Sequence, residues 1–331
     1  MKKKLITDVN QDTTNDVIAA LERGVAPWQK PWSTGAFGPA INLNTGNEYR
    51  GINALLLMLN DHGSSGWLTF KQAKALAVTQ AKASGRKIEE RESVAKNGKK
   101  TVVFWDVDKD ELFKGGVRKG EKSTSIVYFN WLYKDKAGKP VKKASDADTK
   151  YGFWKRYNVF NVEQCDGIET PSAPDDVREH EPLKECEKVV EAMPLPPSIS
   201  HGGGRACYRP DTDAVQMPRP ELFASAEEYY STLFHELAHA TGHSSRLNRE
   251  GITGKARAFG SGVYSKEELV AEMTACFLCR LCRIDTAVID NSAAYLASWI
   301  KVLKGDSTLV IKAASAAQKA YDYITNVKWE N

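Results

Sequence analysis

The residues with the clearest chemistry lie at 235–239, where the chain reads His235-Glu236-Leu237-Ala238-His239. On a helix, residues four positions apart lie on one face, about 6 Å apart along the axis, so two imidazoles can bind one Zn²⁺. Glu236 then projects beside them, where it can accept a proton from water. The pattern predicts a metal centre with His235 and His239 as ligands and Glu236 as the catalytic general base.

The neighbouring sequence predicts that this motif lies on a helix. Ser225, followed three residues later by Glu228, forms a capping-box pattern that starts a helix. Tyrosine, leucine and phenylalanine recur at helical spacing through residues 229–238, and Gly242 has the position of a C-cap.

A catalytic zinc needs a third protein ligand and an open fourth position. His243 comes two residues earlier than the third histidine of the metzincin pattern HExxHxxGxxH. Glu268 and Glu272, four residues apart, share one face of a second helix. If Glu268 is instead the capping-box partner of Ser265, Glu272 or His243 is the better choice for the third ligand. The spacing alone leaves all three residues open as the third ligand.

The segment SKEELVAE at 265–272 resembles the glutamate helix of gluzincins. This resemblance implies that Glu268 is the third metal ligand and that Glu272 hydrogen-bonds a ligand histidine. We expect Glu272 and His243 to surround the ligands. Two histidines and a glutamate favour Zn²⁺ and also admit Mn²⁺, Co²⁺ or Ni²⁺.

A chain of 331 residues predicts two domains. A Pro-rich, acidic segment at 166–182 has the composition of a linker, so we expect a basic domain at 1–165 and a second domain at 183–331.

In the first domain we expect helices at 12–24, 52–60 and 69–84, strands at 101–105, 125–133 and 154–161, and lysine-rich loops at 85–100 and 134–150. In the second we expect a helix at 182–193, a hairpin at 206–217 and mostly helices from 225. The fold class is therefore α+β, with a mainly helical second domain and a small sheet. We expect the hairpin to pair with an extended peptide, near the amide of Val215.

The composition excludes several classes of protein. With 42% hydrophobic and 27% charged residues, the chain is neither wholly disordered nor collagen-like. Six cysteines are too few for a disulfide-stapled scaffold, and Cys276, Cys279 and Cys282 have the spacing of small buried residues. No apolar stretch approaches the roughly 18–20 residues that span a bilayer. We expect a cytoplasmic protein with reduced thiols and no membrane partner.

Charge and aromatic residues are unevenly distributed. Residues 1–165 carry 28 Lys and Arg against 18 Asp and Glu, whereas residues 166–331 carry 18 against 24. Six of the eight tryptophans also precede residue 165. Basic residues interleaved with aromatic residues suit single-stranded nucleic acid, because lysines neutralise phosphates while rings stack on bases. We nevertheless expect most of these rings, including those at 125–129, to pack in the core.

Motifs along the whole chain then resemble one family, the ArdC antirestriction proteins, which are related to the C-terminal part of TraC-type conjugative primases. They are PWQKPW at 27–32, TGNEYRGIN at 45–53, WLTFKQA at 67–73, GVRKGEK at 116–122, YNVFNVEQ at 157–164, HELAHATGHSSRLNR at 235–249 and EELVAE at 267–272. The resemblance implies an N-terminal domain that binds single-stranded DNA and a C-terminal zincin-like (gluzincin) metallopeptidase domain. It also implies protection of incoming plasmid DNA during conjugation. The sequence departs from the family at 78–115, where an extra segment intervenes.

Within the basic domain we expect DNA contacts from aromatic and basic residues in the shared motifs. They are Trp28, Lys30, Trp32, Tyr49, Arg50, Lys71, Lys74, Arg118, Lys119 and Lys122. Two alternative functions remain open. One is a DNA-binding protector whose metal site is structural and does not cleave peptides. The other is a metalloprotease that depends on single-stranded DNA and acts on restriction enzymes or other DNA-bound proteins.

Overall fold

The computed structural model describes residues 8–24, 26, 28, 38–60, 62–94, 100–141, 143–169, 182–254, 262–284 and 293–328. The chain divides into two compact units. Unit 1 consists of residues 1–39, 50–61 and 180–331, and unit 2 of residues 40–49 and 62–179. Helices dominate unit 1 and sheets dominate unit 2, so the expected α+β class is confirmed.

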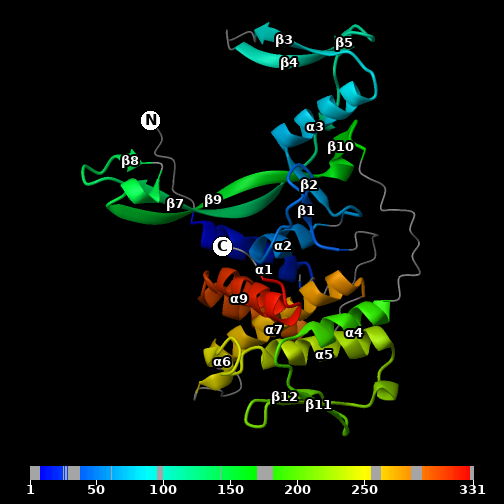
Figure 1. Ribbon diagram of the computed structural model, residues 1–331, viewed down its shortest axis with the longest axis vertical. Coiled ribbons are helices and arrows are strands. Elements are labelled where there is room, and N and C mark those ends of the chain that lie inside the picture. Colours follow the sequence, from blue (N-terminus) through cyan, green and yellow to red (C-terminus); the bar gives the residue numbers. More distant parts are fainter. Residues whose placement is uncertain are drawn as a thin grey trace. The chain divides into compact units, whose positions relative to one another are not determined.

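Unit 1 is a group of helices with one small sheet. Its helices are α1 (Val9–Glu22), α2 (Ile52–Met58), α4 (Pro182–Ala192), α5 (Ala226–Ala240), α6 (Glu250–Thr253), α7 (Gly262–Cys282), α8 (Ala293–Gly305), α9 (Leu309–Ile324) and the 3₁₀ turn η3 (Pro220–Leu222). Helix α7 packs against both α5 and α9 (Figure 1). The sheet has the order β11 (Ser198–His201), β13 (Ala214–Met217), β12 (Cys207–Arg209).

The core of unit 1 forms where α5 meets α7. Leu233, Phe234 and Leu237 of α5 pack in one buried cluster with Leu278 of α7. Cys276, Cys279 and Cys282 are completely buried, as expected for small apolar side chains on this helix. The apolar face of α5 is therefore packed in the core. This packing fixes the helix that carries His235 and His239.

The units are not contiguous in sequence, unlike the division at 1–165 and 183–331 that we expected. Helix α1 packs against α8 and α9, and α2 packs against α9. In α1 the buried side chains Val17, Ile18 and Leu21 form one face. An apolar face in the sequence predicts that a helix is buried, but it does not identify the element that covers it. The sequence therefore could not predict that α1 and α2 pack with the helices of the second half of the chain.

Unit 2 is built on a five-stranded sheet with the order β1 (Ile41–Asn42), β2 (Gly66–Thr69), β9 (Thr149–Asn161), β7 (Thr124–Lys134), β8 (Pro140–Val141). A second sheet has the order β3 (Ile88–Val94), β4 (Lys100–Asp106), β5 (Glu111–Leu112). A third sheet pairs β10 (Cys165–Asp166) with β6 (Gly116–Val117). The remaining elements are α3 (Phe70–Ala83), η1 (Ala144–Asp146) and η2 (Val162–Gln164). A capping box between Thr69 and Gln72 starts α3.

Two sequence expectations for unit 2 were wrong. The segment 85–100, expected as a loop, contains β3 (Ile88–Val94), which has four charged residues and pairs along the whole of β4. The aromatic residues at 125–129, expected in the core, include Tyr128 and Phe129, which are 50% and 39% exposed. The reason is that β7 and β9 extend together as a long two-stranded ribbon (Figure 1).

Among the helices that the structure describes, none combines the length and the apolar character needed to cross a membrane.

Candidate metal centre

Helix α5 positions the motif through local interactions at both ends. Ser225 Oγ accepts a hydrogen bond from the amide of Glu228 at 3.2 Å, and the Glu228 carboxylate accepts one from the amide of Ala224 at 2.8 Å. Gly242 is needed for space rather than for a left-handed C-cap. A Cβ there would lie 2.5 Å from the Ile252 side chain, so glycine lets α6 approach the end of α5.

The structure brings His235, His239 and Glu268 together. The two Nε2 atoms are 3.1 Å apart. Glu268 Oε2 lies 3.6 Å from His235 Nε2, and Oε1 lies 3.5 Å from His239 Nε2. Helix α7 begins at Gly262, so Ser265 lies inside the helix and Glu268 is not its capping partner. One side chain of α7 therefore closes a three-donor group over the two imidazoles of α5.

This geometry and its charge fit a divalent cation. With Zn–N bonds of about 2.0–2.1 Å, two ligand atoms of a tetrahedral site lie about 3.3–3.4 Å apart, close to the three observed distances. Burial alone would lower the pKa of His235. The hydrogen bond that His235 donates to Glu268 and the charges of Glu272, Glu236 and Glu268 outweigh it and raise the pKa of His235 to about 9. The same excess of negative charge favours a bound cation.

The two residues expected around the ligands differ in placement. Glu272 is buried, and its Oε1 accepts a hydrogen bond from the Tyr295 hydroxyl at 3.1 Å, which in turn accepts one from Trp28 Nε1 at 3.0 Å. His243 is not part of the three-donor group. Its Nδ1 is 2.8 Å from Ser245 Oγ and accepts a hydrogen bond from the Ser245 amide at 3.3 Å.

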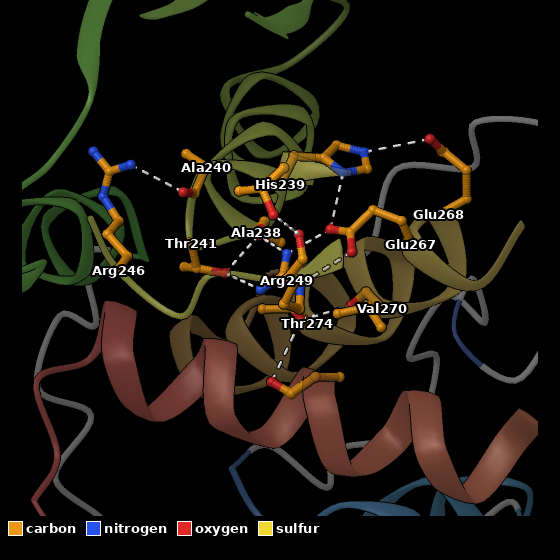
Figure 2. Close-up of polar contacts among 12 residues, drawn as sticks. Ala238, His239, Ala240, Thr241, Arg246, Arg249, Glu267, Glu268, Val270 and Thr274 are labelled. Atoms are coloured by element: carbon orange, nitrogen blue, oxygen red, sulfur yellow. Dashed lines mark hydrogen bonds and ion pairs between the residues drawn. The ribbon is translucent and has the colours of Figure 1, made fainter. Parts of the chain in front are cut away.

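Sequence reasoning missed a buried pair of charges beside His239, Arg249 with Glu267. Arg249 donates twice to the Glu267 carboxylate, and also to Thr241 Oγ1 and the carbonyl oxygen of Ala238 (Figure 2). Glu267 Oε1 in turn lies 3.5 Å from His239 Nδ1. Burial raises the pKa of Glu267, but His239 and Arg249 outweigh it, and the pKa lies below its usual range.

Arg249 therefore ties the end of α5 to α7 and holds a carboxylate against the back of a ligand histidine. Gly251 makes room for this arrangement, because a Cβ there would lie 2.7 Å from Glu267 Cβ. The only sequence signal was that Glu267 precedes the expected ligand Glu268. Its partner, 18 residues earlier in the chain, has no recognisable spacing.

The three donors line a cleft of about 350 Å³ together with Glu236 and the edge strand β12. Glu236 is 8% exposed, and the cleft gives it access to the same space as the imidazoles. Among the strands of the described residues, β12 pairs only with β13, so its other edge carries backbone groups outside this ladder. Our expectation for Val215 was wrong, because Val215 lies on the central strand β13, paired on both sides.

Among the expected DNA contacts, Trp28 is excluded from base stacking. Its side chain has no exposed surface, and its ring packs edge-on against Trp299 with centroids 5.7 Å apart. Lys30 and Trp32 lie outside the described residues. Lys71, Lys119 and Lys122 are exposed and stay predictions.

The other expected DNA contacts take part in packing. Lys74 donates to the carbonyl oxygens of Phe113 and Gly115 at 2.6 and 3.0 Å, and burial lowers its pKa. Arg118 pairs with Glu121 at 3.0 Å, and Arg50 pairs with Asp322. The half-buried Tyr49 accepts a hydrogen bond from Asn42 at 3.0 Å. Their polar groups are thus already bonded within the protein.

Family models match both parts of the chain. The model described as the N-terminal domain of anti-restriction factor ArdC matches residues 7–160, and the zincin-like metallopeptidase model matches residues 184–316. The metal-free crystal structure of antirestriction protein ArdC from plasmid R388 superposes with a TM-score of 0.67 at 31% identity, over 96% of this chain and 97% of that one. The chain belongs to the ArdC antirestriction family. A Mn(II)-bound structure of the same R388 protein matches with a TM-score of 0.64 at 30% identity.

The chain is also similar to proteins of Escherichia coli and Sinorhizobium fredii. The DNA primase TraC of Escherichia coli is 33% identical over 328 residues, and the uncharacterized protein y4eC of Sinorhizobium fredii is 30% identical over 328 residues, 92% of its length. The chain spans only 19% of that TraC primase and 27% of a second one. The zincin-like family model and the Mn(II)-bound relative agree with a divalent metal centre in this member of the family.

Proposed function

We propose that this ArdC-family protein binds single-stranded DNA of a mobile element and carries a metal-dependent peptidase centre that helps to protect the incoming DNA during conjugation. In this proposal it acts in the cytoplasm, where the DNA meets restriction enzymes or other DNA-bound proteins. The observation that carries the peptidase part is the three-donor group of His235, His239 and Glu268 in one cleft with Glu236.

The cation would be held by these three side chains, and we propose zinc because the donor set of two histidines and a carboxylate favours it. When bound, it supplies Lewis acidity toward a peptide carbonyl and lowers the pKa of a water molecule. Glu236 accepts the proton of the attacking water and delivers it to the leaving amine. Glu267, held by Arg249, keeps the His239 ring in its orientation.

The free edge of β12 would align the substrate. An extended peptide that adds to Cys207–Arg209 as a further strand runs along the wall of the cleft, where its carbonyls come close to the three donors and Glu236. Backbone hydrogen bonds of this kind align peptides of many different sequences in the same way. The substrate is thus recognised by an extended backbone, and side-chain pockets add specificity.

The test uses Glu236→Gln, which keeps the shape of the side chain and removes the base. We expect a metal content equal to wild type, loss of peptide hydrolysis, and loss of protection when an unmodified plasmid is transferred into a restricting recipient. Glu221→Gln is the matched control, because Glu221 is exposed in the turn η3. Zinc content by mass spectrometry and counts of transconjugants give the two readouts.

Two outcomes would favour the alternatives. Full protection by metal-loaded Glu236→Gln would identify a DNA-binding protector whose metal site is structural. Hydrolysis that requires added single-stranded DNA would identify a protease directed by DNA toward DNA-bound proteins. If neither wild-type hydrolysis nor wild-type protection is measured, the proposal is wrong.

A further inference from the structure

The outer part of the β7–β9 ribbon carries aromatic side chains on both faces. We call the residues 128–134 of β7 and 150–157 of β9 the aromatic arm. In the antiparallel register, Phe129 lies opposite Trp154 and Trp131 opposite Gly152, while Leu132 lies opposite Tyr151 on the other face. Its exposed aromatic residues are between 37% and 54% exposed and are Tyr128, Phe129, Trp131, Tyr151, Phe153, Trp154 and Tyr157.

Along β7 and β9, this exposure is confined to the arm. Nearer the body of unit 2, the same two strands bury Val127, Ile126 and Val159, which are 4%, 9% and 0% exposed. A half-buried sheet normally alternates apolar and polar side chains, and a contiguous exposed apolar surface marks a binding site. The arm breaks that alternation, so its rings do not serve the core of unit 2.

Lysines accompany the rings. The ammonium groups of Lys134, Lys150 and Lys155 lie 5.1, 4.7 and 5.0 Å from the ring centroids of Tyr151, Trp131 and Tyr157. Within the part of the chain that the structure describes, these ammonium groups pair with rings rather than with carboxylates. Residues 124–161 hold eight Lys and Arg against three Asp and Glu. Positive charge thus sits beside successive ring faces, available to an anionic partner.

One face of the arm is shaped for its rings. Phe129 contacts Trp131 and Trp154, with ring centroids 5.1 and 4.9 Å apart. Gly152 leaves the space they fill, since a Cβ at this position would lie 2.6 Å from the Phe129 ring and 3.3 Å from the Trp131 ring. Gly152 therefore leaves room for the Phe129 ring to pack against the rings of Trp131 and Trp154 on this face.

We propose that single-stranded nucleic acid stacks its bases on the aromatic arm, with the phosphates bound by Lys134, Lys150 and Lys155. This inference rests on the proposed binding of single-stranded DNA and gives it a location on residues that, apart from Tyr157, lie outside the shared motifs named above. A duplex hides the faces of its bases, whereas a single strand presents them to rings, and alternating rings and cations match alternating bases and phosphates. An apolar protein partner would not require lysines beside three of the rings.

The experiment compares variants of the whole chain in fluorescence-anisotropy titrations with a labelled oligothymidine. We expect Trp131→Ala and Trp154→Ala each to weaken binding by about 5- to 150-fold, the range for one stacked base. Leu112→Ala is the matched control. Leu112 lies on β5, outside the arm, is similarly exposed at 49% against 41% for Trp131, and has no ring. We expect its affinity to equal that of wild type.

A salt series separates stacking from charge. Lys150→Ala should reduce the slope of log affinity against log salt by about 0.7, the value for one phosphate contact of a single strand, whereas Trp131→Ala should leave the slope unchanged. Circular dichroism checks that each variant is folded, which we expect because the replaced side chains are exposed.

The outcomes distinguish the two levels of the proposal. If the wild-type chain does not bind the oligonucleotide, the proposed single-strand function fails. If wild type binds and the tryptophan variants bind equally well, the function stands and the aromatic arm is not the site. If Trp131→Ala instead releases the protein from anionic phospholipid vesicles and leaves oligonucleotide affinity unchanged, the arm binds membranes and the inference is overturned.

Discussion

Replacing Arg249 by alanine should destabilise the metal-binding unit strongly, because it leaves a buried carboxylate without its cation. The Glu267 side chain is 6% exposed and that of Arg249 is 13% exposed. Removing one member of a buried ion pair costs about 3–5 kcal/mol, far more than the pair itself contributes over an apolar replacement. The change also removes donors from Thr241 Oγ1 and the Ala238 carbonyl oxygen. We expect a loss of unfolding free energy in that range.

The assay is urea unfolding of the metal-free protein, followed by far-ultraviolet circular dichroism, which reports mainly on the helices of unit 1. Arg219→Ala is the control, since Arg219 is exposed, and it should change stability by less than about 0.5 kcal/mol. The double variant Arg249→Met/Glu267→Gln should recover much of the loss, because no charge is then left buried. A loss below about 1 kcal/mol, or a double variant no more stable than Arg249→Ala, would refute this reasoning.

Two other predictions concern the buried side chain of Trp28 and the ion pair between Arg246 and Asp213, whose Nη1 and Oδ1 atoms lie 2.8 Å apart. Trp28→Ala should cost about 3–5 kcal/mol of unfolding free energy without changing oligonucleotide affinity in the folded protein, because the ring lies in the core. The hydrogen bond from Arg246 holds the pKa of Asp213 below its usual range, so this carboxylate stabilises the fold above about pH 4, its unfolded pKa, and loses that effect as pH falls through its folded pKa. Asp213→Asn should therefore lower the urea midpoint at pH 7, and its difference from wild type should shrink in acid; a constant difference would contradict this.

The parts of the fold that depend on local signals were predictable. The capping pattern at Ser225 and the apolar face that follows it identify α5, because caps and helical periodicity act within a few residues. The same holds for α3, which Thr69 and Gln72 cap. The neighbours of α1 were not predictable, because an amphipathic face does not specify which surface covers it.

The metal centre shows the same limit. His235 and His239 share a helix, so their spacing suffices, whereas Glu268 was identified through a family resemblance before the structure placed it beside them. The pairing of Arg249 with Glu267 depends on the path of the chain between α5 and α7, and no spacing rule describes it. Such contacts between distant segments are set by tertiary packing rather than by periodicity.

The aromatic arm had a signal that was given the wrong meaning. In Tyr128-Phe129-Asn130-Trp131 the aromatic residues do not keep to alternate positions, so they cannot all face one core. Such a strand is either buried on both faces or exposed on both. The strand sequence does not show whether another element covers its faces. The structure shows that both faces are exposed.

The central claim, that His235, His239 and Glu268 hold one divalent cation, is tested most directly by anomalous diffraction from crystals grown with zinc or manganese. We predict one strong anomalous peak about 2.0–2.2 Å from both Nε2 atoms and from a Glu268 carboxylate oxygen, and no peak at this position in His239→Ala. A peak bound by other residues, or a peak that persists in His239→Ala, would contradict the account.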